Sequence, residues 1–430
     1  MLGLGLLERT ALAIPPVQRT ILPNQLVLLV SEEHSLPLVT LQLLVDAGSW
    51  RDPQGKEGLA YVTANGLLLG TSKHRATVLN ELLDFIGASL DASGGRDYAT
   101  LSLQILKKDL DQGLDLFLEA LTQPTFPEEE IRREIEKTLG SIQAAEDQPT
   151  AVATKAFQKA LFPSGPYDHP VEGTRDSLPK LSRELLVDFY RTYYHPNNAI
   201  LAVVGDITLE EAQAKLLLRL TAWPQGKIPK STVNPQFAQG PEKIQIDRPI
   251  TQANIMIGHG GISRENPDYY ALTVMNYILG GGGFASRLVE EIRSARGLAY
   301  SVRSSFDPGR YPGPFQIVLQ TKNASAREAI SLALQQMERL QKEMVSDKEL
   351  EGAKKYLVGS FPLRLGTQAN LAGLLVQVEY YGLGLDYPER YPSLIRSVTR
   401  EDVLRVARTY LHPESCILVV VANLKEAKLD

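Results

Sequence analysis

The chain alternates between stretches with the pattern of strands and stretches with the pattern of helices. In its first half, apolar and polar positions alternate, with many β-branched residues, in NQLVLLVS (24–31), VTLQLLV (39–45) and YATLSLQIL (98–106), which predicts three strands. Apolar residues recur at helical spacing in VLNELLDFIGASLD (78–91) and LDQGLDLFLEAL (110–121), which predicts two helices. This order favours an α+β fold in which helices pack on one face of an antiparallel-rich sheet.

A third helix is expected from Pro127 to Pro149, in PEEEIRREIEKTLGSIQAAEDQP. Proline fits the first position of a helix, and the glutamates that follow it lie at the positive end of the helix dipole. The closing Asp-Gln-Pro ends the helix, because proline cannot continue the hydrogen-bonding pattern.

The two halves of the chain repeat each other. RTYYHPNNAILAVVGDI (191–207) matches RTYLHPESCILVVVANL (408–424), and the offset between His195 and His412 is 217 residues (412 − 195). DAGSWRDPQG (46–55) and GHGGISRENPD (258–268) form a second matching pair, and each follows or overlaps the end of an alternating strand. The Pro-, Gln- and Gly-rich stretch 223–241 between the copies has the composition of a linker. We therefore expect two homologous domains at 1–222 and 242–430, joined by residues 223–241.

Composition excludes few classes of protein. The chain has 430 residues, 43% of them hydrophobic and 22% charged, as in ordinary globular proteins. Its 45 basic and 50 acidic residues give a net charge of −5, which argues against nucleic acid as a partner. The first 16 residues lack the basic region of a full secretory signal, and we expect neither such a signal nor a membrane span. A shortened signal and the compartment, cytoplasm or periplasm, stay open.

Metal-binding and nucleophilic motifs are missing from the sequence. No two of the six histidines are three to five residues apart, so no paired-histidine helix can form a zinc site. The single cysteine, Cys416, starts the apolar run ILVVVA and is interpreted as a buried core residue rather than a nucleophile.

Residues 278–306, ILGGGGFASRLVEEIRSARGLAYSVRSSF, carry the most specific pattern in the chain. They predict a helix, a glycine joint at Gly280, Gly281, Gly282 and Gly283, a second helix capped by Ser286, and a strand from Leu298. No Gly-Lys-Ser/Thr follows the glycines, so a nucleotide site is disfavoured. Arg293 and Tyr300 are hydrogen-bond donors that could serve a peptide carbonyl or a developing oxyanion; the alternative is a helix cap and a residue packed at the sheet rim.

The chain resembles the pitrilysin/insulinase family of zinc metallopeptidases, in particular its processing-peptidase-like branch of short subunits. The resemblance covers nearly the whole chain and rests on the duplicated halves and on five motifs. These are the Gly-Leu-Ala helix near residue 58, EDQP (146–149), YDHPVEGT (167–174), the units of HPNN and a strand, and the GGGxxSRL…RGLAYSV block. In the family, an arginine and a tyrosine seven residues apart in that block help to bind substrate and stabilise the transition state. Arg293 and Tyr300 match this pair, and the glycines Gly280 to Gly283 could contact peptide.

The family's zinc motif, H-x-x-E-H plus a later glutamate, is degenerate in this chain. Aligned on Gly58-Leu59-Ala60, its positions fall on Tyr61, Ala64 and Asn65, and the later glutamate falls on Ser141. Only Glu134, seven residues before Ser141, keeps a carboxylate. The resemblance implies that this chain binds no cofactor, and that Tyr61 and Asn65 hydrogen-bond neighbours such as Glu134 and Ser141.

The resemblance also implies a partner. We expect a heterodimer with a homologous subunit that carries the intact zinc motif, in which this chain supplies Arg293 and Tyr300 and is inactive alone. A homodimer without that partner is open. The alternative is a purely structural or binding subunit with no role in turnover.

Overall fold

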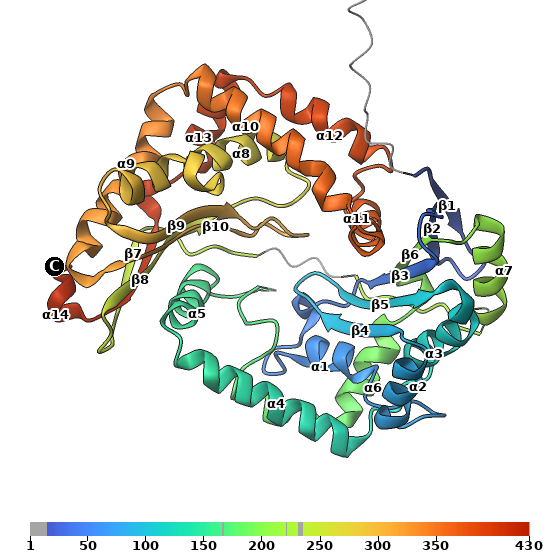
Figure 1. The fold of residues 1–430 in the computed structure, drawn as a ribbon. Coiled ribbons are helices and arrows are strands. Elements are labelled where there is room, and N and C mark those ends of the chain that lie inside the picture. The colour runs from blue at the N-terminus through green and yellow to red at the C-terminus, as the bar shows by residue number, and fades with distance from the viewer. Residues whose placement is uncertain (1–14, 166, 221, 231–234, 430) are drawn as a thin grey trace, which may run out of the picture.

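The computed structural model describes residues 15–165, 167–220, 222–230 and 235–429. The expectation about a secretory signal falls mainly on residues 1–14, outside the described residues. Among the described residues, no helix has both the length and the apolar character needed to cross a membrane. The molecule consists of two curved layers, one built on a six-stranded sheet and one on a five-stranded sheet, which face each other across the middle of Figure 1.

The first sheet contains the strands of the N-terminal half in the order β1-β2-β6-β3-β5-β4. β2 and β6 are parallel and the other neighbours are antiparallel, in agreement with the predicted antiparallel-rich α+β fold. The strands are β1 (Val17–Ile21), β2 (Val27–Glu32), β3 (Leu38–Val45), β4 (Ser89–Gly94), β5 (Ala99–Leu106) and β6 (Ala199–Gly205). The helices are α1 (Leu59–Gly66), α2 (Ala76–Phe85), α3 (Leu110–Thr122), α4 (Glu128–Glu146), α5 (Pro149–Leu161), α6 (Arg183–Tyr193) and α7 (Leu209–Leu220).

The second sheet repeats this arrangement without a counterpart of β1. Its order, β7-β11-β8-β10-β9, matches β2-β6-β3-β5-β4 position by position, and β7 and β11 are again the parallel pair. The strands are β7 (Glu242–Asp247), β8 (Gln252–Gly260), β9 (Ala299–Phe306), β10 (Pro314–Lys322) and β11 (Ile417–Ala422). The helices are α8 (Tyr269–Asn276), α9 (Ala326–Lys342), α10 (Asp347–Ser360), α11 (Gln368–Tyr380), α12 (Tyr387–Arg396), α13 (Arg400–Tyr410) and α14 (Leu424–Ala427).

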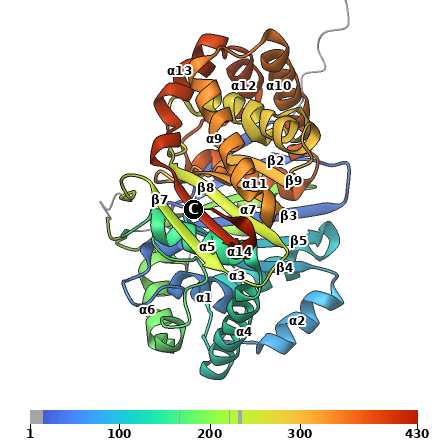
Figure 2. The same ribbon diagram turned by 90° about the vertical axis from the view of Figure 1, so that its left-hand side faces the viewer.

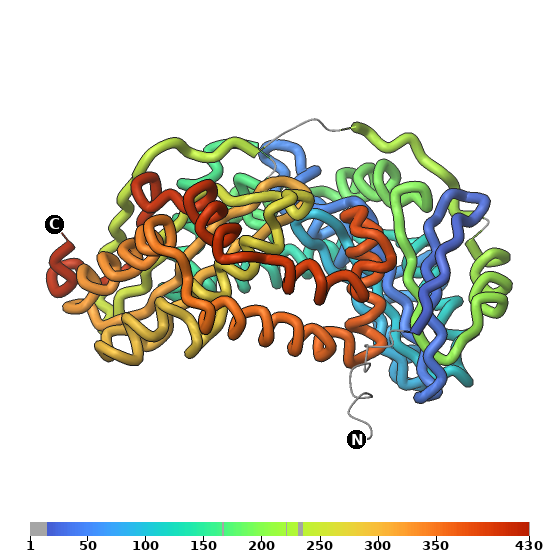
Figure 3. Tube along the Cα trace, turned by 90° about the horizontal axis from the view of Figure 1, so that it is seen from above, coloured from blue at the N-terminus to red at the C-terminus, as the bar shows by residue number. Residues whose placement is uncertain are grey.

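Each half places one helix on the sheet of the other half. α5 lies on the second sheet, where Phe157 packs with Met256 and Val419, and α11 lies on the first sheet, where Leu375 packs with Leu44. The two helices begin 219 residues apart (368 − 149), close to the repeat offset. Figure 2 labels α5 and α11 in the middle of the molecule, where the two layers meet, and Figure 3 shows the two halves side by side from above. The sequence predicted helices on one face of each sheet; the exchanged helix covers part of the other face.

Two local expectations are corrected. The helix expected over 78–91 ends at Phe85 as α2, and residues 89–94 form the edge strand β4 instead. Gly87 has φ +62°, a left-handed conformation that suits glycine and ends the helix. Ser286 does not cap the helix that follows it, because its hydroxyl donates to the carbonyl of Gly283 at 2.6 Å. Residues Val289–Ser294 form a π-helical turn.

Candidate functional site

The helix that carries the degenerate zinc-motif positions is fixed at its N-terminus. The carboxylate of Asp52 accepts hydrogen bonds from the backbone N–H groups of Gly58, at 2.7 Å, and Ala60, at 2.8 Å. Gly58 has φ +92°, and a Cβ there would lie 2.7 Å from the carbonyl oxygen of Glu172. Only glycine fits this position, so α1 enters the core with a set orientation.

A hydrogen bond joins α1 to α4 at Asn65, which the resemblance aligns with the second histidine of the motif. Asn65 Nδ2 donates to Glu134 Oε1 at 3.1 Å, and Lys137 Nζ lies 3.0 Å from Glu134 Oε2. The predicted bond between Asn65 and Glu134 is therefore confirmed. Ala64 is fully buried, and the ring of Tyr61 packs against the core without a polar partner among the described residues.

Ser141 does not take part in this contact. It is exposed, and its hydroxyl donates to the carbonyl of Lys137, four residues earlier in α4, at 3.1 Å. The expected hydrogen bond to Asn65 or Tyr61 is wrong. A serine inside a helix commonly bonds to the carbonyl four residues back, and that local partner is available here.

These residues do not fit a zinc ion. Zinc requires three or four His, Cys, Asp or Glu ligands, whereas Tyr61, Ala64, Asn65 and Ser141 offer a phenol, a methyl group, an amide and a hydroxyl. The one carboxylate nearby, on Glu134, is already paired with an amide and an ammonium group. Throughout the part of the chain that the structure describes, no three potential ligands converge.

Arg293 and Tyr300 lie on the surface of the second half, next to its edge strand. Tyr300 is on β9 and is 73% exposed, and Arg293 is exposed in the π-helical turn before it. Neither polar group has a hydrogen-bond or ion-pair partner among the described residues. The guanidinium carbon of Arg293 lies 4.7 Å from the ring centre of Phe284, itself 71% exposed. The alternative that Arg293 caps its helix therefore has no supporting contact.

The glycine joint is packed at three of its four positions. A Cβ at Gly280 would lie 2.6 Å from the backbone nitrogen of Ser304, and one at Gly281 would lie 2.7 Å from the side chain of Asn276. At Gly282 it would lie 2.7 Å from the carbonyl of Tyr277. Gly283 has open space around it and φ +56°. Close packing thus accounts for Gly280, Gly281 and Gly282, and contact with peptide stays a prediction.

Cys416 offers no alternative nucleophile. Its side chain is buried at the start of β11, as predicted, and its thiol donates to the carbonyl of His412 at 3.3 Å. Burial raises the pKa of the Cys416 thiol to about 12, so the thiolate needed for nucleophilic attack is disfavoured.

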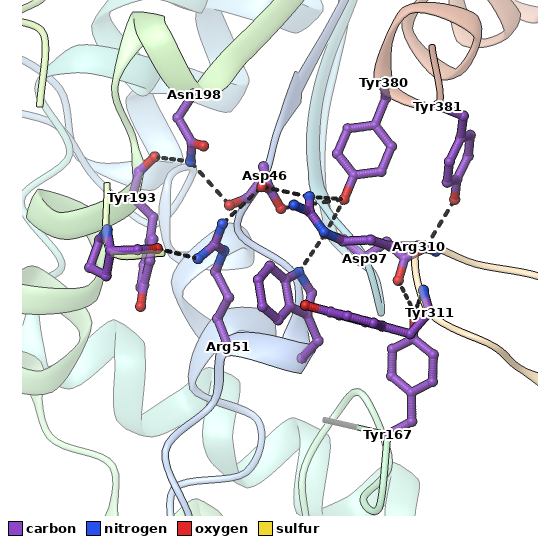
Figure 4. Close-up of polar contacts among 12 residues, drawn as sticks. Asp46, Arg51, Asp97, Tyr167, Tyr193, Asn198, Arg310, Tyr311, Tyr380 and Tyr381 are labelled. Carbon is purple, nitrogen blue, oxygen red and sulfur yellow. Dashed lines mark hydrogen bonds and ion pairs between the residues drawn. The ribbon is translucent and has the colours of Figure 1, made fainter. Parts of the chain in front are cut away.

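A polar cluster at the junction of the two halves was not predicted from the sequence (Figure 4). We call it the junction cluster; it consists of Asp46, Arg51, Asp97, Tyr167, Arg310, Tyr380 and Tyr381. Arg310, from the loop between β9 and β10, reaches Asp46 Oδ2 at 2.9 Å and the hydroxyl of Tyr380 at 3.2 Å. An ion pair and a hydrogen bond therefore link residues of the two halves.

Asp97 is a buried charged residue of the junction cluster, with 6% of its surface exposed. Its carboxylate accepts hydrogen bonds from the hydroxyl of Tyr381 at 2.9 Å, from the backbone N–H of Arg310 at 2.6 Å and from the hydroxyl of Tyr167. Three donors satisfy a charge that would otherwise be costly to bury. A sequence signal existed in the loop DPGRYPG (307–313), where an arginine and a tyrosine lie among glycines and prolines.

Two family models match successive parts of the chain. The model described as Insulinase (Peptidase family M16) matches residues 27–175. The model described as Peptidase M16 inactive domain matches residues 180–357.

Solved and curated relatives extend over nearly the whole chain. A crystal structure described as the peptidase M16 inactive domain from Pseudomonas fluorescens is 30% identical, with a TM-score of 0.88, and covers 94% of this chain and 98% of its own. The non-peptidase homolog YmxG of Helicobacter pylori is 25% identical over 403 residues, 92% of each chain. The probable mitochondrial-processing peptidase subunit beta of Arabidopsis thaliana is 25% identical over 427 residues, covering 96% of this chain and 80% of its own.

Proposed function

We propose that this chain, which belongs to the insulinase family of peptidases (family M16), is the zinc-free subunit of a heterodimeric metalloendopeptidase. It binds no metal itself. A homologous partner subunit with an intact H-x-x-E-H motif supplies zinc and the glutamate base, and this chain supplies Arg293 and Tyr300 to a composite site. Alone, it has no peptidase activity.

The observation that carries the proposal is the free state of these two donors. The neighbouring Arg287, whose side chain is only 9% exposed, is bound by Glu349 at 2.6 Å, as a structural arginine is expected to be. Arg293 and Tyr300 have no such partner, and both extend from the region of β9 into solvent. Donors held free on a rigid strand and turn can reach a carbonyl oxygen on another molecule.

The surroundings of Arg293 support this role. The guanidinium group lies over the exposed ring of Phe284, an arrangement that holds a cation by its attraction to the face of the ring. This contact leaves the N–H groups of Arg293 available, because the face of the Phe284 ring accepts no conventional hydrogen bond from them. The contact with Phe284 thereby orients Arg293, while its N–H groups form no hydrogen bond with any residue that the structure describes.

A purely structural role makes different predictions. A scaffold subunit would still bind its partner through the shared fold, but Arg293 and Tyr300 would not affect turnover. The Helicobacter pylori relative is named a non-peptidase homolog, which agrees with either role for a chain without zinc ligands.

Reconstitution with a zinc-motif subunit separates the two roles. The chain is co-purified with a homologous subunit from the same genome, and cleavage of a quenched fluorescent peptide library is measured for each subunit and for the mixture. We expect activity only in the mixture, with zinc only in the partner. Tyr300→Phe should lower kcat about a hundredfold, since one donor to the oxyanion contributes roughly 10²–10³.

Tyr356→Phe is the matched control, because Tyr356 is also an exposed tyrosine, 56% exposed on α10. It should leave kcat unchanged, and size-exclusion chromatography should show the same complex for both variants. An equal kcat for Tyr300→Phe and the unsubstituted complex would assign the chain a scaffold role. Peptide cleavage by the lone chain would contradict the proposal altogether.

A further inference from the structure

Tyr300 is the extra residue of a β-bulge. β9 pairs with β10 in a constant register as far as Ser301, which lies opposite Gln320. The next pair is Ala299 opposite Thr321, so the register shifts by one residue and Tyr300 is left without a partner on β10, a strand that the structure describes in full. Tyr300 and Ser301 are both exposed, which breaks the alternation of β9. A bulge of this kind bends the strand and aims the side chain of its extra residue in a new direction.

The corresponding edge strand of the first half, described in full, pairs without a bulge. β4 occupies the place in the first sheet that β9 occupies in the second. It pairs with β5 in one register over its whole length, from Ser89 opposite Gln104 to Gly94 opposite Ala99. The bulge is therefore not part of the repeated architecture, and it occurs at the tyrosine whose phenol has no partner among the described residues.

The hydroxyl of Thr321 holds the chain at the start of this bulge. Its Oγ1 donates to the carbonyl of Leu298, two residues before Tyr300, at 2.6 Å. Thr321 is 1% exposed and continues the row of Ile317 and Leu319, which belong to the hydrophobic core of the second half. A hydroxyl in such a row is costly to bury unless it is hydrogen-bonded, whereas valine has nearly the same shape without this cost. The bond to Leu298 therefore explains why a polar side chain stands at this position.

The segment before the bulge is also fixed at its other end. The N–H of Leu298 donates to the carbonyl of Ile292 at 2.9 Å, and the N–H of Gly297 donates to the carbonyl of Arg293 at 2.9 Å. Ile292 is fully buried in the core of the second half. Leu298 is thus held at both its N–H and its C=O, and the bulge begins from a fixed point next to the turn that carries Arg293.

We propose that Thr321 is a positioning residue: its hydroxyl holds the bulge, and the bulge sets the direction of the Tyr300 phenol. This inference rests on the proposed function, in which Tyr300 serves a composite site. Thr321 itself touches no substrate, because its side chain is buried and its hydroxyl is bonded within the chain. A displacement of about 1 Å in a positioned group can lower a rate by about a hundredfold, so one buried hydroxyl can influence turnover.

Thr321→Val and Thr321→Ser separate the hydroxyl from the rest of the side chain. In the complex reconstituted with the zinc-motif subunit, Thr321→Val should lower kcat by about tenfold or more with KM unchanged, and Thr321→Ser should retain kcat. In the Tyr300→Phe background, Thr321→Val should change kcat by less than about twofold, because no phenol is left to position. An equal kcat for Thr321→Val and the unsubstituted complex, or the same tenfold loss in the Tyr300→Phe background, overturns the proposal.

A second measurement observes Tyr300 without the partner subunit. Fluorotyrosine is incorporated at position 300 of the lone chain, and its fluorine NMR resonance is compared among the variants. Thr321→Val should displace or split the resonance, and Thr321→Ala, which also lacks the hydroxyl, should do the same. Thr321→Ser should leave it unchanged, and a label at Tyr356 on α10 should report no change in any variant.

The two measurements distinguish the failure of this proposal from the failure of the proposed function. Circular dichroism verifies that each variant is folded. An unchanged Tyr300 resonance in folded Thr321→Val overturns the positioning role. If the reconstituted complex is inactive, or if Tyr300→Phe leaves kcat unchanged, the proposed function fails, and the resonance alone decides whether Thr321 directs the phenol.

Discussion

Asn65 Nδ2 donates to Glu134 Oε1 at 3.1 Å, and this bond joins α1 to α4. The carboxylate of Glu134 thereby takes part in packing the two helices. The contact explains why a helix as apolar as α1 keeps a polar group at this position: Glu134, 7% exposed, needs a donor.

Asn65→Leu should therefore destabilise the protein. The substitution removes the shorter of the two hydrogen bonds to Glu134 Oε1 and leaves only Lys137, at 3.4 Å, as a donor to this buried oxygen, at a cost of about 1–3 kcal/mol. Urea denaturation followed by circular dichroism measures the loss. Ser141→Ala is the control, because the exposed Ser141 bonds only within its own helix, and its effect should stay within about 0.5 kcal/mol. Equal stability of Asn65→Leu and the unsubstituted protein would show that the bond contributes nothing.

Asp97→Asn tests the junction cluster. The amide keeps one acceptor oxygen, but its NH₂ group faces hydroxyl and N–H groups that also donate. The free energy of unfolding should therefore fall by about 3 kcal/mol. Asp307→Asn is the matched control. The side chain of Asp307 is 51% exposed and pairs with Arg96, so its change should cost no more than about 1 kcal/mol.

Asp97→Asn and Asp307→Asn also test whether the junction cluster holds the two halves together. Weakening the junction cluster should raise the rate at which protease cleaves the connecting residues 223–241, and Asp307→Asn should not. Identical cleavage rates for Asp97→Asn and the unsubstituted chain would mean that helices α5 and α11 hold the halves together without the junction cluster.

His259 should make stability depend on pH. Burial lowers the pKa of His259 to about 4, and its Nε2 accepts the backbone N–H of His412 at 3.1 Å. The unfolded chain has the ordinary value near 6.5, so between these values it binds a proton that the folded protein does not. Stability is therefore full above pH 6.5 and falls as the pH decreases toward 4, by about 3 kcal/mol in total.

The measurement compares urea unfolding at pH 7 and pH 5 for the unsubstituted protein and for His259→Gln. The variant lacks the titrating ring. The change in its free energy of unfolding between pH 7 and pH 5 should therefore be about 2 kcal/mol smaller than that of the unsubstituted protein. The same pH dependence in both proteins would assign the effect to other groups.

Cys416 should be slow to react with thiol reagents in the folded protein. The side chain is buried, and burial raises its pKa to about 12, so the reactive thiolate is scarce at neutral pH. Labelling with Ellman's reagent should be slow in buffer and rapid in denaturant. Fast, stoichiometric labelling of the native chain would reopen the interpretation of Cys416 as a nucleophile.

Sequence alone determined the features that depend on local pattern and on repetition. Alternating and helical spacing placed β3, β5 and α3 close to their observed bounds, and the repeat predicted two homologous halves, whose sheets have matching strand orders. Residue type also shows that Tyr61, Ala64, Asn65 and Ser141 offer a poor ligand set for zinc, because a phenol, a methyl group, an amide and a hydroxyl are not the imidazole and carboxylate groups that hold zinc.

Only the tertiary structure decided which distant groups meet. α5 buries Phe157 on the second sheet and α11 buries Leu375 on the first, but hydrophobic burial is not directional, so the sequence does not say which sheet receives each helix. The pairing of Arg310 with Asp46 joins residues 264 positions apart, and the hydroxyl of Ser141 turned to its own helix although Asn65 was expected. Such contacts depend on how whole layers pack, and single-residue chemistry does not determine them.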